Sequence, residues 1–183
     1  TIADLKSQEA KIDVWGVGTN MITGGDTSSL GGVYKLSAIE CGGKLVPRMK
    51  MSDNINKVTN PGVKKVLRLY SRSGYALADL IALEEEVIDD KKPLTIFDPV
   101  ETWKQTTLTD FYAKELLVPV FKDGKQVYFS PSLPEICEYA KKEMGTFWEE
   151  YKRLIRPHKY KVDLTDKLFD LKKSIMNSKN KPL

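Results

Sequence analysis

The sequence predicts an α+β fold, in which one α/β segment is followed by strands and hairpins and then by two helices. Three observations carry this prediction. A helix-like stretch and an apolar, strand-length run end at a glycine turn within residues 2–19. Short alternating runs separated by glycine, proline and Asp-Gly turns fill residues 33–129. Apolar side chains recur with helical spacing over residues 132–175.

The first segment is organised around residues 11–19, Lys-Ile-Asp-Val-Trp-Gly-Val-Gly-Thr. Its β-favouring residues predict a short buried strand: Ile12, Val14 and Val17. Gly16 and Gly18 remove two Cβ atoms from the turn that follows, so the backbone can approach a ligand closely. With the hydroxyl of Thr19, the backbone N–H groups of this turn are suited to binding a phosphate at the end of a strand. A plain tight turn leaving a sheet is the alternative on local sequence alone.

The middle of the chain is predicted to alternate strands with turns. Strands are expected over residues 33–39, 45–51, 65–70, 76–83 and 94–97. Residues 41–44 are expected to form a hairpin turn, and Pro47 places its strand at an edge or a bulge because proline donates no N–H. Residues 100–117 are expected to be extended, although 112–117 could be helical. Asp123-Gly124 between two apolar runs predicts another hairpin.

Two helices are predicted in the last quarter. Ser132 and Glu135 form a capping box, and the helix that starts there is expected to continue to Leu154 and to stop before Pro157. Asp163 is expected to cap the second helix. The apolar stripe of that helix consists of Leu164, Leu168, Leu171 and Ile175.

Composition excludes several classes of function. The 183 residues are 41% hydrophobic and 30% charged, which is typical of a soluble globular protein, and no apolar run approaches the ~20 residues of a membrane span. The net charge of +4 and aromatic residues at helical core positions argue against a nucleic-acid interface. Cys41 and Cys137 have no metal-ligand spacing and are expected to be free thiols in a reducing cytoplasm. His158 is the only histidine, so no metal site is expected.

Four motifs occur in an order that resembles the C-terminal portion of nicotinate phosphoribosyltransferase: Asp13–Thr19, Leu30–Leu36, Pro47–Lys50 and Thr59–Gly62. Residues 116–120 and 131–133 are similar to the same family, so the resemblance covers nearly the whole chain. It implies that residues 1–52 are the end of an α/β barrel, with a helix, a strand and a phosphate loop. Residues 53–183 are then a mainly antiparallel β domain with two C-terminal helices.

The resemblance also implies a function. The family transfers phosphoribosyl from 5-phosphoribosyl 1-pyrophosphate to nicotinate, giving nicotinate mononucleotide for NAD salvage, coupled to ATP hydrolysis with Mg2+. It implies a cytoplasmic homodimer, and it places Gly16, Gly18 and Thr19 on the phosphoribosyl phosphate. The family's phosphorylatable histidine, nicotinate-binding arginine and acidic barrel residues lie before the point where this chain begins. The chain is therefore expected to be a C-terminal fragment that partners the missing N-terminal part and is inactive alone, with no catalytic residue of its own.

Other residues leave alternatives open. Asp13 could orient Thr19 or a ribose hydroxyl, or could accept a local backbone N–H. Lys35 and Arg48, expected on adjacent strands, could reach phosphate or pyrophosphate, or could be solvated. His158 matches no catalytic motif and is expected to be a surface or capping residue. The alternative to an enzyme part is a non-catalytic α+β module that uses its hairpins and helices for docking.

Overall fold

The computed structural model describes residues 2–25, 28–29, 31–54, 57–101 and 103–179. The chain forms two compact units, residues 1–34 and residues 35–183, which are described separately. The division at residues 52 and 53 drawn from the resemblance stays a prediction. No helix within the described ranges is long and apolar enough to cross a membrane.

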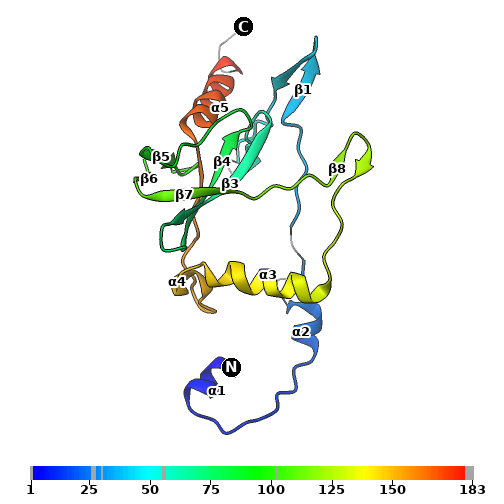
Figure 1. Cartoon of the computed structure of the whole chain (residues 1–183), viewed down its shortest axis with the longest axis vertical. Coiled ribbons are helices and arrows are strands. Elements are labelled where there is room, and N and C mark those ends of the chain that lie inside the picture. The colour runs from blue at the N-terminus through cyan, green and yellow to red at the C-terminus, as the bar shows by residue number, and fades with distance from the viewer. Residues whose placement is uncertain (1, 26–27, 30, 55–56, 102, 180–183) are drawn as a thin grey trace. The chain divides into compact units, whose positions relative to one another are not determined.

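The first unit contains two short helices joined by irregular chain (Figure 1). Helix α1 spans Ile2–Ser7, which confirms the helix expected there, and α2 spans Thr19–Thr23. The prediction of a strand over residues 12–17 is wrong, because the structure has no strand between these helices. A strand needs a neighbour to pair its N–H and C=O groups, and the described part of this unit offers none. None of its described residues is buried.

The second unit begins with a hairpin, β1 (Ala38–Cys41) and β2 (Lys44–Pro47). Gly42 and Gly43 both have positive φ, 59° and 75°, as the two-residue turn requires. The hairpin is confirmed, but its strands are shorter than residues 33–39 and 45–51. Just beyond the hairpin, the N–H groups of Arg48 and Gly62 both donate to the carbonyl oxygen of Ser37, at 2.8 and 2.7 Å.

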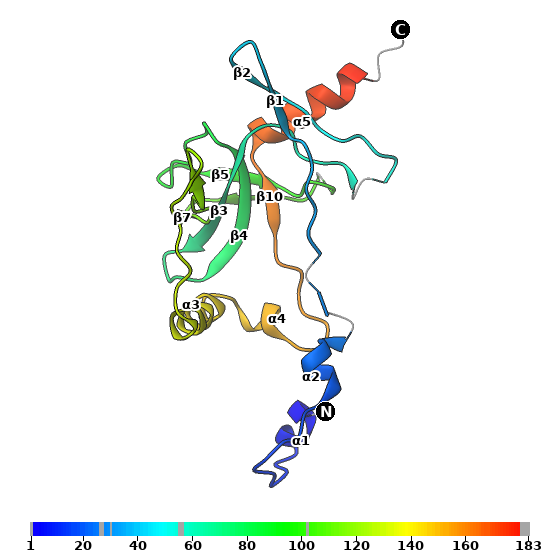
Figure 2. The same cartoon turned by 90° about the vertical axis from the view of Figure 1, so that its right-hand side faces the viewer.

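A six-stranded sheet forms the body of the second unit, in the order β6-β5-β10-β4-β3-β7 (Figures 1 and 2). Neighbouring strands are antiparallel except for the parallel pair β10 and β4. The strands expected around residues 65–70, 76–83 and 94–97 are confirmed, and residues 105–108 and 111–115 form strands and not a helix. The bounds are β3 Lys64–Ser71, β4 Ala76–Leu83, β5 Leu94–Phe97, β6 Gln105–Leu108, β7 Phe111–Glu115 and β10 Val162–Leu164. The fold is a mixed α+β fold, as predicted.

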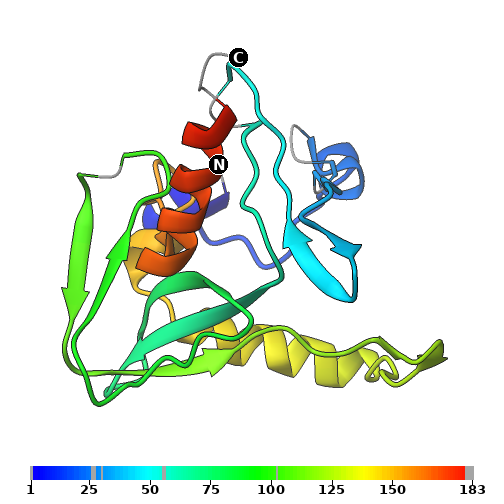
Figure 3. The same cartoon turned by 90° about the horizontal axis from the view of Figure 1, so that it is seen from above.

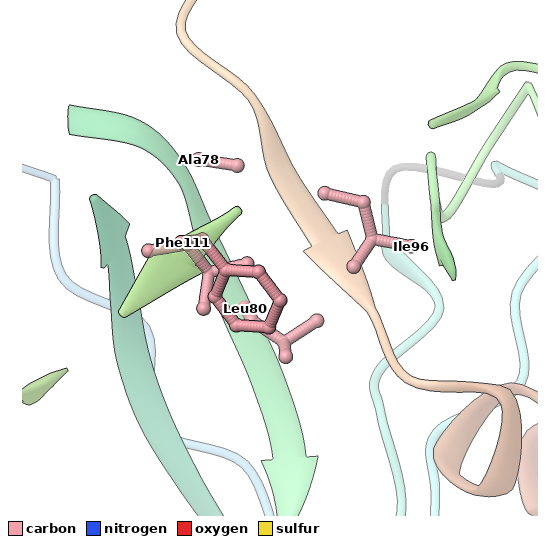
Figure 4. Close-up of a cluster of buried hydrophobic side chains, with 5 residues drawn as sticks. Ala78, Leu80, Ile96 and Phe111 are labelled. Carbon is pink, nitrogen blue, oxygen red and sulfur yellow. The ribbon is translucent and has the colours of Figure 1, made fainter. Parts of the chain in front are cut away.

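The core lies on one face of this sheet. Alternate residues of β4 are buried, as expected for a strand with one covered face. Ala78 and Leu80 of β4 meet Ile96 of β5 and Phe111 of β7, and Leu69 of β3 completes the cluster (Figure 4). These side chains come from strands far apart in the sequence, so the cluster holds the sheet together.

Three helices and a second hairpin complete the unit. The predicted hairpin at Asp123-Gly124 is confirmed, although its strands are only two residues each. Helix α3 starts at the predicted capping box, in which the Ser132 N–H donates to Glu135 Oε2 at 2.8 Å. The bounds are β8 Phe121–Lys122, β9 Lys125–Gln126, α3 Leu133–Gly145, α4 Glu149–Lys152 and α5 Asp166–Lys179.

Two predictions about these helices are wrong. The first helix does not continue to Leu154, because α3 ends at Gly145, a poor helix former, and α4 is separate. Asp163 does not cap the last helix, because it lies in β10 opposite Leu80 of β4. The capping position belongs to Thr165, whose hydroxyl oxygen accepts from the Leu168 N–H at 3.3 Å. From there α5 packs against β4 and β5 (Figure 3).

Candidate functional site

The residues predicted to bind phosphate come together in one pocket of the first unit. Residues 15–20 line it together with Ile2 and Leu5 of α1, around a volume of about 460 Å3. Gly16, Gly18 and Thr19 are all exposed to it. The pocket therefore has an apolar wall from α1 and a backbone wall from the glycine loop.

The backbone wall ends at the start of α2. The N–H groups of Met21 and Ile22 donate to the Gly18 carbonyl oxygen at 3.0 and 3.3 Å, which starts the helix. The N–H groups of Thr19 and Asn20 and the Thr19 hydroxyl have no hydrogen-bond partner among the residues that the structure describes. The first N–H groups of a helix have no acceptor within it, so they are available to an anion. This arrangement could donate three hydrogen bonds to one phosphate group.

The two glycines are not required by the packing of this unit. A Cβ built on Gly16 or Gly18 would meet no atom within 4 Å among the described residues. Gly18 has φ −108°, outside the left-handed region that favours glycine. Close approach of a ligand would give these positions a reason to be glycine that the chain itself does not.

Asp13 belongs to the first unit but does not line this pocket. Asp13 is exposed and makes no hydrogen bond or ion pair with any described residue, so the local backbone N–H expected as its alternative partner is not found. Lys35 and Arg48 belong to the second unit. Their placement on adjacent strands was wrong, because Lys35 precedes β1 and Arg48 follows β2. The Arg48 guanidinium donates to the Pro47 carbonyl oxygen at 3.0 Å.

His158 is a surface residue, as predicted. Its backbone N–H donates to the Glu150 carbonyl oxygen at 2.9 Å, and its ring meets the Tyr151 ring edge to face at 6.5 Å. Both cysteines, Cys41 and Cys137, are exposed free thiols. His158 and both cysteines belong to the second unit.

Sequence reasoning missed a polar network that joins α3 to the sheet. Arg68 of β3 binds Asp79 of β4 in a bidentate ion pair, with Nε–Oδ1 at 2.8 Å and Nη2–Oδ2 at 3.0 Å. Its third nitrogen lies 3.4 Å from Glu143 Oε2 on α3. Arg68 and Asp79 are Cα partners across the β3–β4 hairpin. The Ser-Arg-Ser-Gly turn, which sets that register, was the signal that could have paired them.

Neighbouring side chains complete this network. Glu143 also accepts from the Tyr70 hydroxyl and from Lys114 Nζ, both at 3.2 Å. Burial favours a higher pKa for Glu143, but the hydrogen bonds and charges of these partners prevail and lower it. The hydrogen bond from Arg68 to Asp79 raises the pKa of Arg68 further above its already high value. The Arg68 guanidinium stacks 4.9 Å from the Phe147 ring centre. The network is a structural anchor for α3.

Comparisons with known proteins agree with the four motifs. Residues 63–172 match the model of the nicotinate phosphoribosyltransferase C-terminal domain. The chain is 46% identical to nicotinate phosphoribosyltransferase of Bacillus subtilis over 167 residues, covering 91% of this chain and 34% of that protein. It is 34% identical to the Dictyostelium discoideum enzyme, covering 93% of this chain and 30% of the relative.

A solved structure gives the same result. The crystal structure of human nicotinic acid phosphoribosyltransferase matches with a TM-score of 0.67 and 32% identity, over 81% of this chain and 27% of that one. The chain spans about a third of the length of the curated relatives it matches. These matches confirm the resemblance drawn from the motifs. The chain belongs to the nicotinate phosphoribosyltransferase family, to whose C-terminal portion it corresponds.

Proposed function

We propose that this chain is the C-terminal part of an enzyme that joins nicotinate to 5-phosphoribosyl 1-pyrophosphate, giving nicotinate mononucleotide and pyrophosphate for NAD synthesis. The observation that carries the proposal is the match of 91% of the chain to an enzyme of that name at 46% identity. In this proposal residues 1–52 end the barrel and residues 53–183 form the C-terminal domain. The enzyme acts in the cytoplasm as a homodimer.

Within this enzyme the glycine loop holds the phosphate of the phosphoribosyl group. The N–H groups of Thr19 and Asn20 and the Thr19 hydroxyl donate to phosphate oxygens, because none of them has another acceptor in the described structure. Ile2 and Leu5 shield one side of the pocket from water. Gly18 lets the backbone approach without a Cβ between it and the ligand.

The pocket holds no lysine or arginine among its lining residues, so its attraction for phosphate comes from oriented dipoles. Lys35 and Arg48 are the residues of this chain proposed to reach the donor's phosphate or pyrophosphate, and Asp13 is proposed for a ribose hydroxyl. For binding the phosphoribosyl donor, these three residues are secondary candidates after Gly16, Gly18 and Thr19.

The described residues do not fit a resident metal site. No group of three or more His, Cys, Asp or Glu among them is arranged to hold a metal ion. The ATP and Mg2+ implied by the family would therefore be held elsewhere in the enzyme. This chain alone should make no nicotinate mononucleotide, because the resemblance places the groups that bind nicotinate and accept the ATP phosphate outside these residues.

The test uses a chimera in which this chain replaces the matching third of the Bacillus subtilis enzyme. Steady-state kinetics are measured with each substrate varied in turn. A hydrogen bond to a charged group contributes about 1.5–3 kcal/mol, so Thr19→Ala should raise the KM for 5-phosphoribosyl 1-pyrophosphate roughly 10- to 100-fold. The KM for nicotinate should change much less, and Thr19→Ser should be mild because the hydroxyl survives.

Thr23→Ala is the matched control. Thr23 lies on the same short helix, but its hydroxyl donates to the Thr19 carbonyl oxygen and it does not line the pocket. It should leave the donor KM unchanged, and thermal melting checks that each variant folds. A well-folded Thr19→Ala with an unchanged donor KM would show that the loop is only a structural turn.

A further inference from the structure

The second unit carries an apolar surface that its own core does not cover. The connection from β7 to α3, residues 116–131, is called the arm here; its only ladder is the two-residue pair β8 and β9, and α3 has no buried residue. Figure 1 shows the arm, in yellow-green, extending beyond the sheet before the chain enters α3. Six exposed side chains define the arm–helix surface: Val118, Phe121, Phe129, Leu133, Ile136 and Tyr139.

The arm and α3 meet in a groove. Val118 and Tyr128 of the arm face it with Ile136 and Tyr139 of α3, and its volume is about 720 Å3. This volume lies within the range of ordinary binding pockets. The groove is therefore large enough to accept side chains from another surface.

The charged side chains around the groove already have partners. Lys114 pairs with Glu143 at 3.2 Å, and Glu115 pairs with Lys65 at 3.3 Å. Glu135 accepts from Ser132 in the capping box. Because these charges are satisfied within the chain, the groove offers mainly apolar contacts to whatever covers it.

Three large aromatic side chains of the arm and α3 are exposed. Phe121, Phe129 and Tyr139 alone leave about 300–500 Å2 open, given the size of aromatic side chains. Together with the mainly apolar lining of the groove, these exposed side chains indicate an interaction site. Largely apolar contacts are typical of permanent interfaces, whereas transient ones are more polar.

We propose that the arm–helix surface docks permanently against the part of the enzyme that lies outside this match, with apolar side chains of that part filling the groove. This inference rests on the proposed function. The chain corresponds to 34% of the Bacillus subtilis relative and 27% of the human structure, so most of each relative's polypeptide is available to cover the surface. A permanent neighbour in the same polypeptide explains why the surface can be apolar.

Amide hydrogen exchange tests this proposal. Residues 116–139 are followed by mass spectrometry in this chain alone and in the chimera with the Bacillus subtilis enzyme. They should exchange at least about tenfold more slowly in the chimera. Phe129→Asp should remove most of that protection. Trp103→Asp is the matched control, since Trp103 is an aromatic residue outside the surface that is 74% exposed, against 77% for Phe129, and it should leave the protection intact.

The outcomes separate this inference from the proposed function. Equal exchange in an active chimera overturns the docking and leaves the function standing. Protection in a chimera that makes no nicotinate mononucleotide supports the docking and overturns the function. Concentration-dependent protection of this chain alone, with dimers in sedimentation, overturns the proposal by making a second copy the occupant. If the chimera does not fold, the unmodified Bacillus subtilis enzyme and its excised matching segment give the same comparison.

Discussion

The Arg68 network allows a stability prediction with an internal control. Arg68→Met keeps much of the aliphatic length of the side chain but removes its hydrogen bonds to Asp79 and Glu143. All three side chains are only 14–16% exposed, so the two carboxylates stay largely out of water after their partner is removed. Arg72→Met removes a second Arg–Asp pair, with Asp110, whose side chains are 52% and 76% exposed.

The expected costs differ because of this burial. Removing one partner of a buried ion pair costs about 3–5 kcal/mol. Asp79 keeps a hydrogen bond from Tyr160, and Glu143 keeps those from Tyr70 and Lys114, so we expect about 2–4 kcal/mol for Arg68→Met. An exposed pair contributes about 0–1 kcal/mol, which is the expected cost of Arg72→Met.

Urea denaturation of this chain at pH 7 measures both. With a slope of about 2 kcal/mol per molar, Arg68→Met should lower the midpoint by about 1–2 M and Arg72→Met by less than about 0.5 M. Both variants lose one positive charge, so long-range charge effects are matched. An equal loss of unfolding free energy in the two variants would refute the reasoning that burial makes the Arg68 network more stabilising than the Arg72–Asp110 pair.

Three further predictions follow from single positions. Gly62→Ala should lower the free energy of unfolding by about 1–3 kcal/mol, because φ is +83° and a new Cβ would lie 3.0 Å from a leucine methyl of β4. Gly74→Ala, at φ +87° in open space, should lower it clearly less. Comparable urea midpoints for the two variants would contradict this. Phe111→Ala should cost about 3–5 kcal/mol by calorimetry, since the side chain is fully buried, and a cost below 1 kcal/mol would exclude its place in the core. Burial raises the pKa of Asp163, so its charged form destabilises the fold at pH 7. Its stabilising contribution is complete below the unfolded pKa of about 3.9 and is lost as pH rises through the higher folded value. Asp163→Asn should therefore stabilise the fold at pH 7 by on the order of 1 kcal/mol, seen as a higher Tm, and lose this advantage near pH 3; an equal gain in Tm at both pH values would contradict this.

Local signals in the sequence predicted the elements that need no distant partner. Asp123-Gly124 specifies its own hairpin, because both residues adopt positive φ, at 51° and 74°. Ser132 and Glu135 specify the start of α3, because they satisfy each other's backbone. In both cases the interaction that decides the structure lies within four residues.

Elements that depend on neighbours far along the chain were predicted less well. Ile12 and Val14 favour β structure, but a strand forms only where another strand pairs with it, and none does so among the described residues of the first unit. Asp163 is a residue type that often caps helices, yet it pairs in the sheet with Leu80 of β4, which lies 83 residues earlier in the chain. In neither case did the intrinsic preference of the residue type determine the secondary structure that formed.

The candidate site combines both kinds of signal. The donors at Thr19 and Asn20 come from the first turn of α2, so they are present although the expected strand is not. That strand is thus not needed to form the donors. Gly18 has no packing reason to be glycine in this unit, so Gly18→Ala should leave the stability of the chain nearly unchanged while it weakens phosphate binding in the chimera. This separation of folding from binding is what distinguishes a phosphate loop from a turn that only joins two elements.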